Sequence, residues 1–303
     1  MDGRISNFAQ LASLRRYTLT EGSGKGLDIL DCDNGKIRFL LNVSKALDIL
    51  QLWHEGQNIS FLSKNGFTAR ETPFPNRFEG GMLYTCGLDG IGVREGCELH
   101  GSHHNTPAVV TRAECTEEGI TVVAETAETE LFGKNLIFMR KIFTAIGSDS
   151  VAIEDTLENR AYRDEKYCLL YHVNLGYPML DEGAEISGEI AEVSSRTPWA
   201  KKHEAECEII TVPVDNREEM CYFLKFRTPQ VSLGNEKIKK AFTLSWSDDT
   251  LPHFVEWKSM ASGDYALGLE PCTTELDGGF AYQTLKAGER VRFSLNIKVS
   301  DIK

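Results

Sequence analysis

The sequence predicts an all-β protein, built as a large antiparallel β-sandwich. Short segments of alternating or β-branched apolar residues recur along the chain, and Gly, Asn and Asp turns separate them. Helical periodicity is weak except in residues 5–16, where we expect a short amphipathic helix. Alternating strand and helix units are therefore disfavoured, and a sandwich would bury one face of each strand.

The segments that fit a strand best are spread over the whole chain. They are residues 36–41, 119–123, 136–143, 150–154, 167–173, 208–212, 220–226, 242–246 and 290–298. Asp-Asn-Gly at 33–35 and Glu-Glu-Gly at 117–119 are predicted turns. Neither a repeat of fixed period nor a Pro- or Ser-rich linker divides the chain, so we expect residues 1–303 to form one domain.

Charge and composition exclude several classes of partner. The chain has 303 residues and a net charge of -12, which would repel a nucleic acid backbone. Its apolar stretches are too short to span a bilayer, and residues 1–10 lack the apolar core of a signal peptide. Eight cysteines are scattered without a C-x-x-C pair, which favours reduced thiols. We expect a cytoplasmic protein with neither nucleic acid nor membrane as a partner.

A first candidate site segment covers residues 75–87 and continues to residues 98–105. Its glycines allow the backbone to approach a ligand closely, and Arg77 offers a fork of donors for hydroxyls or a carboxylate. His100 lies in the second part of the segment. The structural alternative is a Gly-rich turn region with surface histidines.

A second candidate segment is the predicted strand at residues 170–178, which ends in a Gly/Pro turn. His172 and Asn174 lie two residues apart and therefore point to the same face of the strand. An imidazole beside an amide suits a sugar hydroxyl or ring oxygen. The alternative is a core histidine that hydrogen bonds to a backbone carbonyl.

A third candidate segment, residues 265–273, places Glu270 inside an otherwise apolar strand. Gly268 shares its face and leaves space above the sheet. A carboxylate is costly there unless it is paired or functional, and desolvation would raise its pKa towards that of a general base. Just upstream, Trp257 offers an aromatic face for a sugar and Lys258 a positive charge. The alternatives are a structural ion pair for Glu270, and a solvated lysine beside a core tryptophan.

Taken in order, these segments resemble the aldose 1-epimerase, or galactose mutarotase-like, superfamily. Residues 99–101 (Leu-His-Gly) are similar to its first histidine motif, residues 171–174 (Tyr-His-Val-Asn) to its second, and residues 268–271 (Gly-Leu-Glu-Pro) to the strand of its catalytic glutamate. Residues 78–87 and 251–258 are similar to a bacterial aldose 1-epimerase-like branch. The resemblance extends over residues 35–298.

The resemblance implies a β-supersandwich with a sugar cleft on one sheet face, and an isomerase that interconverts the α and β anomers of a free sugar. By motif position, Glu270 would be the general base and His172 the general acid. His100 would polarise the sugar, while Arg77 and Asn174 would hold hydroxyls. Opening a cyclic hemiacetal needs one proton removed and another delivered, so neither a metal nor another cofactor is required.

One element of the family pattern has no secure counterpart in this sequence. The aspartate that also grips the sugar in galactose mutarotases has only Asp248, Asp249 and Asp264 as candidates, by neighbourhood. Asp48 matches a motif of the bacterial branch, either as a substrate contact or as a partner of a turn backbone.

Two other functions remain open from the sequence, and the sequence leaves the sugar and the oligomeric state undetermined. One is a non-catalytic carbohydrate-binding or sugar-sensing protein on the same fold, although binding alone needs no acid and base together. The other is a metal-dependent isomerase that uses His100, His103, His104 and Glu98 as ligands. It is disfavoured because these residues lie in a Gly/Asn turn and leave Glu270 unexplained.

Overall fold

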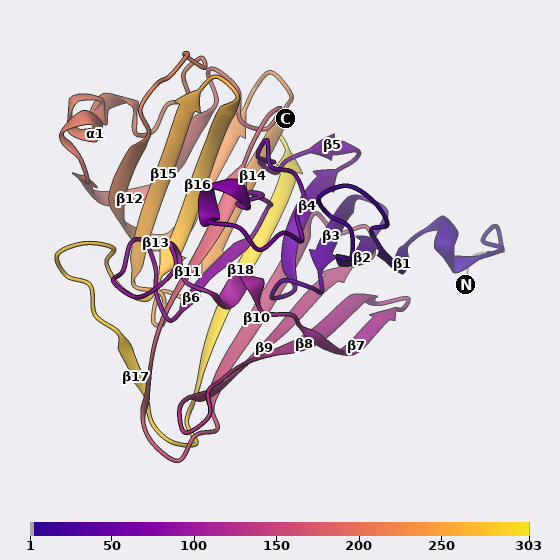
Figure 1. The fold of residues 1–303 in the computed structure, drawn as a ribbon. Helices are drawn as coiled ribbons and strands as arrows, with labels where there is room; N and C mark the ends of the chain where they lie inside the picture. Colours follow the sequence, from indigo (N-terminus) through magenta and orange to yellow (C-terminus); the bar gives the residue numbers. More distant parts are fainter. Residues whose placement is uncertain (1–2, 303) are drawn as a thin grey trace.

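A computed structural model describes residues 3–302 and confirms the all-β class. The chain forms two antiparallel sheets (Figure 1). The smaller sheet has the strand order β1-β2-β3-β4-β5 and comprises β1 (Ser13–Thr18), β2 (Asp28–Asp33), β3 (Ile37–Asn42), β4 (Asp48–His54) and β5 (Gln57–Asn58). The predicted turn at residues 33–35 joins β2 to β3, with Gly35 at a φ of 91°.

The larger sheet has 13 strands, in the order β17-β11-β16-β15-β13-β14-β18-β10-β9-β8-β7, with β12 paired to β13 and β6 to β11. Its strands are β6 (Tyr84–Leu88), β7 (Val109–Cys115), β8 (Gly119–Thr129), β9 (Asn135–Ala145), β10 (Ser150–Asn159), β11 (Glu165–Leu175), β12 (Glu185–Ser195), β13 (Met220–Asn235), β14 (Lys240–Trp246), β15 (His253–Ala261), β16 (Asp264–Cys272), β17 (Gln283–Leu285) and β18 (Arg290–Asp301).

Among the described residues, helical structure is limited to single turns. They are η1 (Phe8–Gln10), η2 (Phe74–Asn76), η3 (His103–Asn105), α1 (Pro198–Lys202) and η4 (Glu204–Glu206). Within residues 3–302, no helix has the length and apolar character needed to cross a membrane.

One hydrophobic core is shared by the two sheets. Phe39 and Leu41 of the smaller sheet belong to the same buried cluster as Phe138, Ile153 and Phe293 of the larger sheet. Burial alternates along β8 and β10, as expected for strands with one face on a core. The opposite face of the larger sheet is therefore available for other contacts.

That opposite face carries a second, smaller apolar cluster. This cluster is rich in sulfur. It contains four cysteines, each from a different strand: Cys86, Cys168, Cys221 and Cys272. The segment around η2 lies over this face (Figure 1), and its Phe74 and Phe78 pack against the cluster. All eight cysteines are free thiols, as the sequence predicts. The candidate site lies on this face.

The predicted helix over residues 5–16 is wrong. Asn7 caps only the single turn η1, where its side chain accepts the N–H of Ala9. The chain then enters β1, which pairs along its whole length with β2. Six cross-strand pairs and the contact of Leu14 with the core outweigh the weak helical periodicity.

The predicted strand at residues 208–212 is also wrong, since only an isolated bridge from Ile209 to Glu185 forms there. The buried Lys258 ammonium takes the backbone carbonyls that border the segment. It donates to the carbonyls of Glu206 and Cys207 at 2.8 and 2.5 Å, just before the segment, and lies 3.5 Å from that of Ile209. Backbone acceptors that bond to a side chain are lost to a strand ladder.

Candidate active site

Three neighbouring strands bring the candidate residues to one face of the larger sheet. β11, β16 and β15 lie side by side, with Asn174 opposite Gly268 and Gly268 opposite Trp257. Because side chains alternate along a strand, His172 of β11 and Glu270 of β16 share the face of these residues. This juxtaposition agrees with the parity that the sequence predicts.

His172 and Glu270 approach each other above Gly268. Nε2 of His172 lies 3.1 Å from Oε1 of Glu270, and both side chains are almost completely buried. A Cβ at position 268 would lie 2.5 Å from Oε1 of Glu270 and 2.9 Å from the His172 ring. Glycine is therefore needed at position 268 for the pair to form.

Burial pushes both members of this pair towards their neutral forms. It raises the pKa of Glu270 well above its usual value, with a further contribution from Glu219 and an opposing one from Arg196. Burial, reinforced by His100, lowers the pKa of His172 to about 3. Near neutral pH, Glu270 is therefore protonated and His172 is neutral, so the two side chains carry one ionisable proton, on Glu270.

His100 joins the pair from the segment that covers the sheet. Its ring centroid lies 5.7 Å from that of His172, at nearly a right angle. Its backbone has a φ of 65°, and the following Gly101 also has a positive φ; a Cβ at position 101 would lie 2.4 Å from the carbonyl oxygen of Gly90. Burial, and then Arg196, lowers the pKa of His100 to about 4, so the imidazole is neutral at neutral pH.

Arg77 lies next to η2 and forms an ion pair with Glu98, in the same covering segment as His100. The Nε atom of Arg77 is buried and has no hydrogen-bond partner in the described part of the chain. Unsatisfied buried donors favour a polar ligand. Glu98 is a partner that the sequence analysis considered only as a metal ligand.

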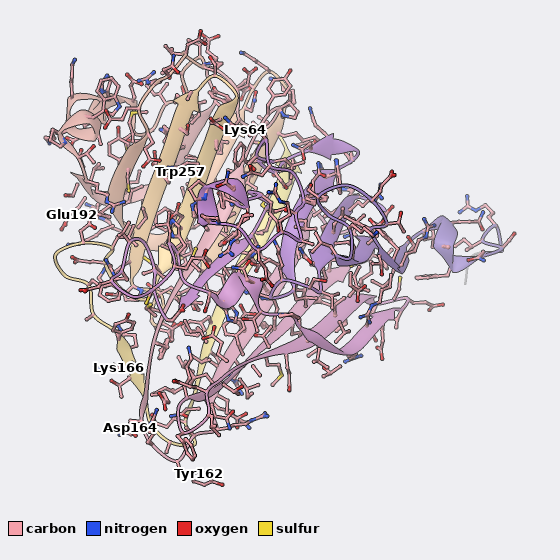
Figure 2. All side chains as sticks on the ribbon, in the orientation of Figure 1. Lys64, Tyr162, Asp164, Lys166, Glu192 and Trp257 are labelled. Carbon is pink, nitrogen blue, oxygen red and sulfur yellow. The ribbon has the colours of Figure 1, made fainter. Side chains whose placement is uncertain are left out.

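Aromatic side chains surround His172. The centroid of Trp257 lies 5.5 Å from the imidazole and that of Phe78 lies 5.6 Å from it, while Phe74 stacks on Phe78. Trp257 occupies β15 (Figure 2), and its Nε1–H donates to Oε2 of Glu219 at 2.7 Å. Glu219 is not among the predicted site residues, because only the pairing of β13 with β15 brings it next to Trp257.

The placement of Lys258 in the site is wrong. It follows Trp257 on β15 and therefore points to the opposite face, where it is completely buried. There its ammonium lies 3.0 Å from Glu256 and binds backbone carbonyls of the segment that contains η4. The two-residue period of a strand already predicts that Lys258 and Trp257 point to opposite faces.

Asn174 shares the face of His172 but has no exposed surface. Its Nδ2–H donates to the carbonyl of His172 at 2.9 Å, and its Oδ1 has no partner among residues 3–302. This hydrogen bond indicates that Asn174 orients the strand beneath His172. It does not favour direct contact of Asn174 with a sugar hydroxyl.

Asp48 and the histidines beside His100 are buried and are held by other polar side chains. Asp48 is completely buried and accepts hydrogen bonds from Thr85 and from Nδ1 of His104, the latter at 2.6 Å. His103 instead faces Glu128, at 2.9 Å. Of the two roles considered for Asp48, the structure favours the contact with backbone over the contact with substrate. The two histidines bind separate carboxylates. They do not form the metal centre of the isomerase alternative.

The three candidate aspartates lie at strand ends: two in the turn before β15 and one at the start of β16. Asp248 and Asp249 are exposed in the turn between β14 and β15. Asp264 begins β16 and forms an ion pair with Lys64 at 2.7 Å.

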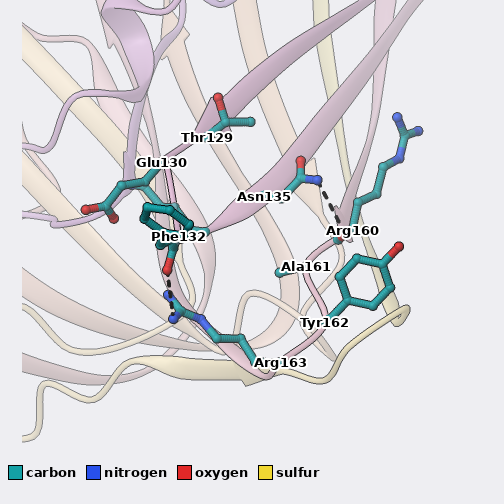
Figure 3. Close-up of a pocket in the computed structure, with 10 residues that line it drawn as sticks. Thr129, Glu130, Phe132, Asn135, Arg160, Ala161, Tyr162 and Arg163 are labelled. Atoms are coloured by element: carbon teal, nitrogen blue, oxygen red, sulfur yellow. Dashed lines mark hydrogen bonds between the residues drawn. The ribbon is translucent and has the colours of Figure 1, made fainter.

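A separate surface cavity of about 420 Å³ lies far along the sheet from these residues, between the β8–β9 and β10–β11 loops (Figure 3). Phe132 and Tyr162 line it and are almost fully exposed. Arg163 crosses between the loops and donates to the carbonyl of Phe132 at 3.3 Å. Neither His172 nor Glu270 lines this cavity.

The fold is that of the galactose mutarotase-like β-sandwiches, as comparison with solved structures shows. One similar structure, from Klebsiella pneumoniae subsp. pneumoniae, carries a provisional description as an aldose 1-epimerase; its TM-score is 0.86 at 21% identity, over 97% of this chain and 86% of that one. A galactose mutarotase-like protein from Clostridium acetobutylicum has a TM-score of 0.73 at 12% identity, over 97% and 100%. A galactose mutarotase related enzyme from Lactobacillus acidophilus has a TM-score of 0.58 at 13% identity, over 95% and 100%.

Within this class of fold, the chain belongs to the family described as a domain of unknown function (DUF4432), whose model matches residues 24–299. No curated protein sequence matches the chain. The identities to the solved structures are low, so they establish the fold, whereas the chemistry depends on the residues of the site.

Proposed function

We propose that the protein binds a free sugar on the open face of the larger sheet and interconverts its α and β anomers. The observation that carries this proposal is the buried pair of His172 and Glu270, 3.1 Å apart beneath aromatic side chains. An acid and a base side by side suit a reaction that removes one proton and returns another.

In the proposed reaction, the proton that Glu270 holds at rest first passes to His172. The Glu270 carboxylate then accepts the proton of the anomeric hydroxyl while protonated His172 donates to the ring oxygen. The bond between the ring oxygen and the anomeric carbon breaks, and the anomeric carbon becomes an aldehyde. Rotation about the adjacent carbon–carbon bond exposes the other face of the carbonyl, and the same steps in reverse close the ring. The proton count of enzyme and sugar is unchanged after one cycle.

The neighbouring residues would hold the sugar during this exchange. His100, neutral at neutral pH, can accept or donate a hydrogen bond to a hydroxyl. Arg77 offers its buried Nε–H. Trp257, fixed by Glu219, presents an apolar ring to the C–H face of a pyranose.

Polarimetry of freshly dissolved pure anomers tests this function. A panel of neutral and acidic aldoses is followed with and without the protein, and the uncatalysed rate is subtracted. At least one sugar should equilibrate faster, in proportion to protein concentration. Sugar binding without acceleration for any member would instead favour a carbohydrate-binding or sugar-sensing protein.

The pH dependence of the exchange should follow the coupled pair. We expect kcat/KM to be level around neutral pH and to fall on both sides. In acid the pair takes up a second proton, governed by the lowered pKa of His172 near about 3, and the base is lost. In alkali, above the raised pKa of Glu270, the proton of Glu270 is lost, and none remains to pass to His172 as the acid. A single step centred near pH 6.5 would instead indicate an exposed histidine, and would contradict the buried pair.

The cleft should prefer an unphosphorylated sugar. Glu98 compensates the charge of Arg77, Asp277 pairs with Arg196, and Lys258 faces away. A phosphate usually recruits several donors or an arginine cluster. Titration calorimetry with an active aldose and its phosphate ester should give an equal or lower Kd for the aldose. Binding of the ester at least tenfold more tightly would contradict this charge assignment.

A further inference from the structure

A second group of reactive side chains lies where the turn between β4 and β5 meets the ends of β14 and β18 (Figure 1). A ring nitrogen of His54 and carboxylate oxygens of Glu55 and Asp301 all lie within 4.8 Å of one another. Glu55 and Gly56 form the two-residue turn of this hairpin, both with positive φ. The turn fixes Glu55 directly beside His54.

The His54 ring is held so that one nitrogen faces this group without a partner. The side chain is 1% exposed, and Nε2 lies 2.8 Å from Oδ1 of Asp149, which Lys36 holds in turn. A carboxylate accepts, so Nε2 carries the hydrogen and Nδ1 presents a lone pair. Nδ1 has no hydrogen-bond partner in the structure, and its nearest carboxylate oxygen, on Glu55, is 3.8 Å away.

We propose that His54, Glu55 and Asp301 bind a divalent transition-metal cation, with Zn²⁺ as the best match. One imidazole nitrogen and two carboxylates are a donor set that Zn²⁺ accepts, with the remaining position left to water. Asp149 supplies the carboxylate that typically orients a metal-bound histidine from behind. The side chains of Glu55 and Asp301 are 46% and 64% exposed, so they are free to rotate to ligand distances of about 2.0–2.2 Å.

Lys240 competes with the cation for the same carboxylates. Its ammonium lies 2.6 Å from Glu55 and 2.6 Å from Asp301. In the absence of metal its single positive charge pairs with both carboxylates and leaves a net negative charge, and a dication displaces it. Bound metal would tie the smaller sheet, through the β4–β5 turn, to the end of β18 in the larger sheet. It would therefore raise the unfolding temperature while leaving the distant His172 and Glu270 unchanged.

Binding of Zn²⁺ and Co²⁺ to the purified full chain tests this site. The background protein carries Cys97→Ser and Cys115→Ser, because these two thiols are partly exposed and would bind zinc themselves. A chromophoric zinc indicator gives the affinity, the visible spectrum of Co²⁺ reports coordination, and thermal unfolding reports stabilisation. One equivalent should bind and raise Tm.

Four variants separate the site from adventitious surface binding. Asp301→Asn and Glu55→Gln alter exposed side chains, and each should abolish the stoichiometric binding and the rise in Tm. Asp149→Asn should weaken binding by about 10- to 100-fold. Lys240→Met should tighten it by removing the competing cation.

The matched control is Asp264→Asn, which also removes an exposed carboxylate paired with a lysine, on β16. It should bind like the background protein. The proposal is overturned if the background protein binds no equivalent of either metal, or if Asp301→Asn and Glu55→Gln retain its affinity. Anomer exchange is a separate readout, so failure of the metal site and failure of the proposed function are distinguishable.

Discussion

Glu270→Gln should reduce catalysed anomer exchange by about a hundredfold or more while the protein stays folded and still binds sugar. The amide keeps the shape of the side chain but cannot accept the proton of the anomeric hydroxyl. Stability should be unchanged or higher, because the buried acid has a pKa raised well above its usual value. With a folded-state pKa above the unfolded one, the acid lowers the free energy of unfolding as pH rises, and glutamine removes that cost.

Glu256→Gln is the matched control, since it makes the same change on the other face of the sheet. Glu256 is also fully buried, on the adjacent strand, but it pairs with Lys258 at 3.0 Å. Its loss should destabilise the fold and leave exchange per folded molecule near that of the native chain. Exchange at the native rate by Glu270→Gln would show that Glu270 is not the base. Saturation-transfer measurements and chemical unfolding give the two readouts.

Arg140→Met should lower the free energy of unfolding by about 3–5 kcal/mol, the largest stability effect that we expect. Arg140 is 1% exposed and links the smaller sheet to the larger one, with ion pairs to Asp48 and to Asp155 at 2.5 and 2.7 Å. It also donates to Thr85 at 2.9 Å. Burial alone would raise the pKa of Asp48, but hydrogen bonding to His104 and the charge of Arg140 hold it below the usual value.

The deficit of Arg140→Met should shrink in acid. A buried carboxylate without its cation binds a proton more readily in the folded state, so the stability of the variant falls as pH rises. Chemical unfolding at neutral and at mildly acidic pH measures this difference. Lys141→Met is the control on the same strand, because Lys141 and Glu154 form an exposed pair at 2.9 Å; it should cost less than about 1 kcal/mol. Equal small losses for the two variants would contradict a structural role for the buried network.

The strand period predicted the part of the site that depends on local sequence. His172 and Asn174 share a face, and Gly268 leaves room for Glu270, as the alternation indicates. The same rule excludes Lys258 once Trp257 is placed on the cleft face. The wrong prediction for Lys258 arose because both residues were assigned to the site although adjacent residues of a strand point to opposite faces.

Contacts between distant segments were beyond sequence reasoning. Arg140 meets Asp48 only because β9 of the larger sheet packs against the smaller sheet, and no periodic pattern encodes that meeting. Glu219 reaches Trp257 only through the register of β13 with β15. The carbonyls of Glu206 and Cys207, just before residues 208–212, bond to Lys258, about 50 positions further along the chain. Local propensity is overridden where a buried charge takes the backbone carbonyls.

Saturation-transfer NMR at anomeric equilibrium tests the proposed chemistry most directly. Irradiation of the α anomeric proton of an aldose, in the presence of native protein, should reduce the β signal through catalysed exchange, without any net reaction. The native chain should transfer saturation at a rate proportional to its concentration, and Glu270→Gln at equal concentration and with retained sugar binding should not. Transfer by both proteins, or by neither for any sugar that binds, would contradict the assignment of His172 and Glu270 as the acid and base of anomer exchange.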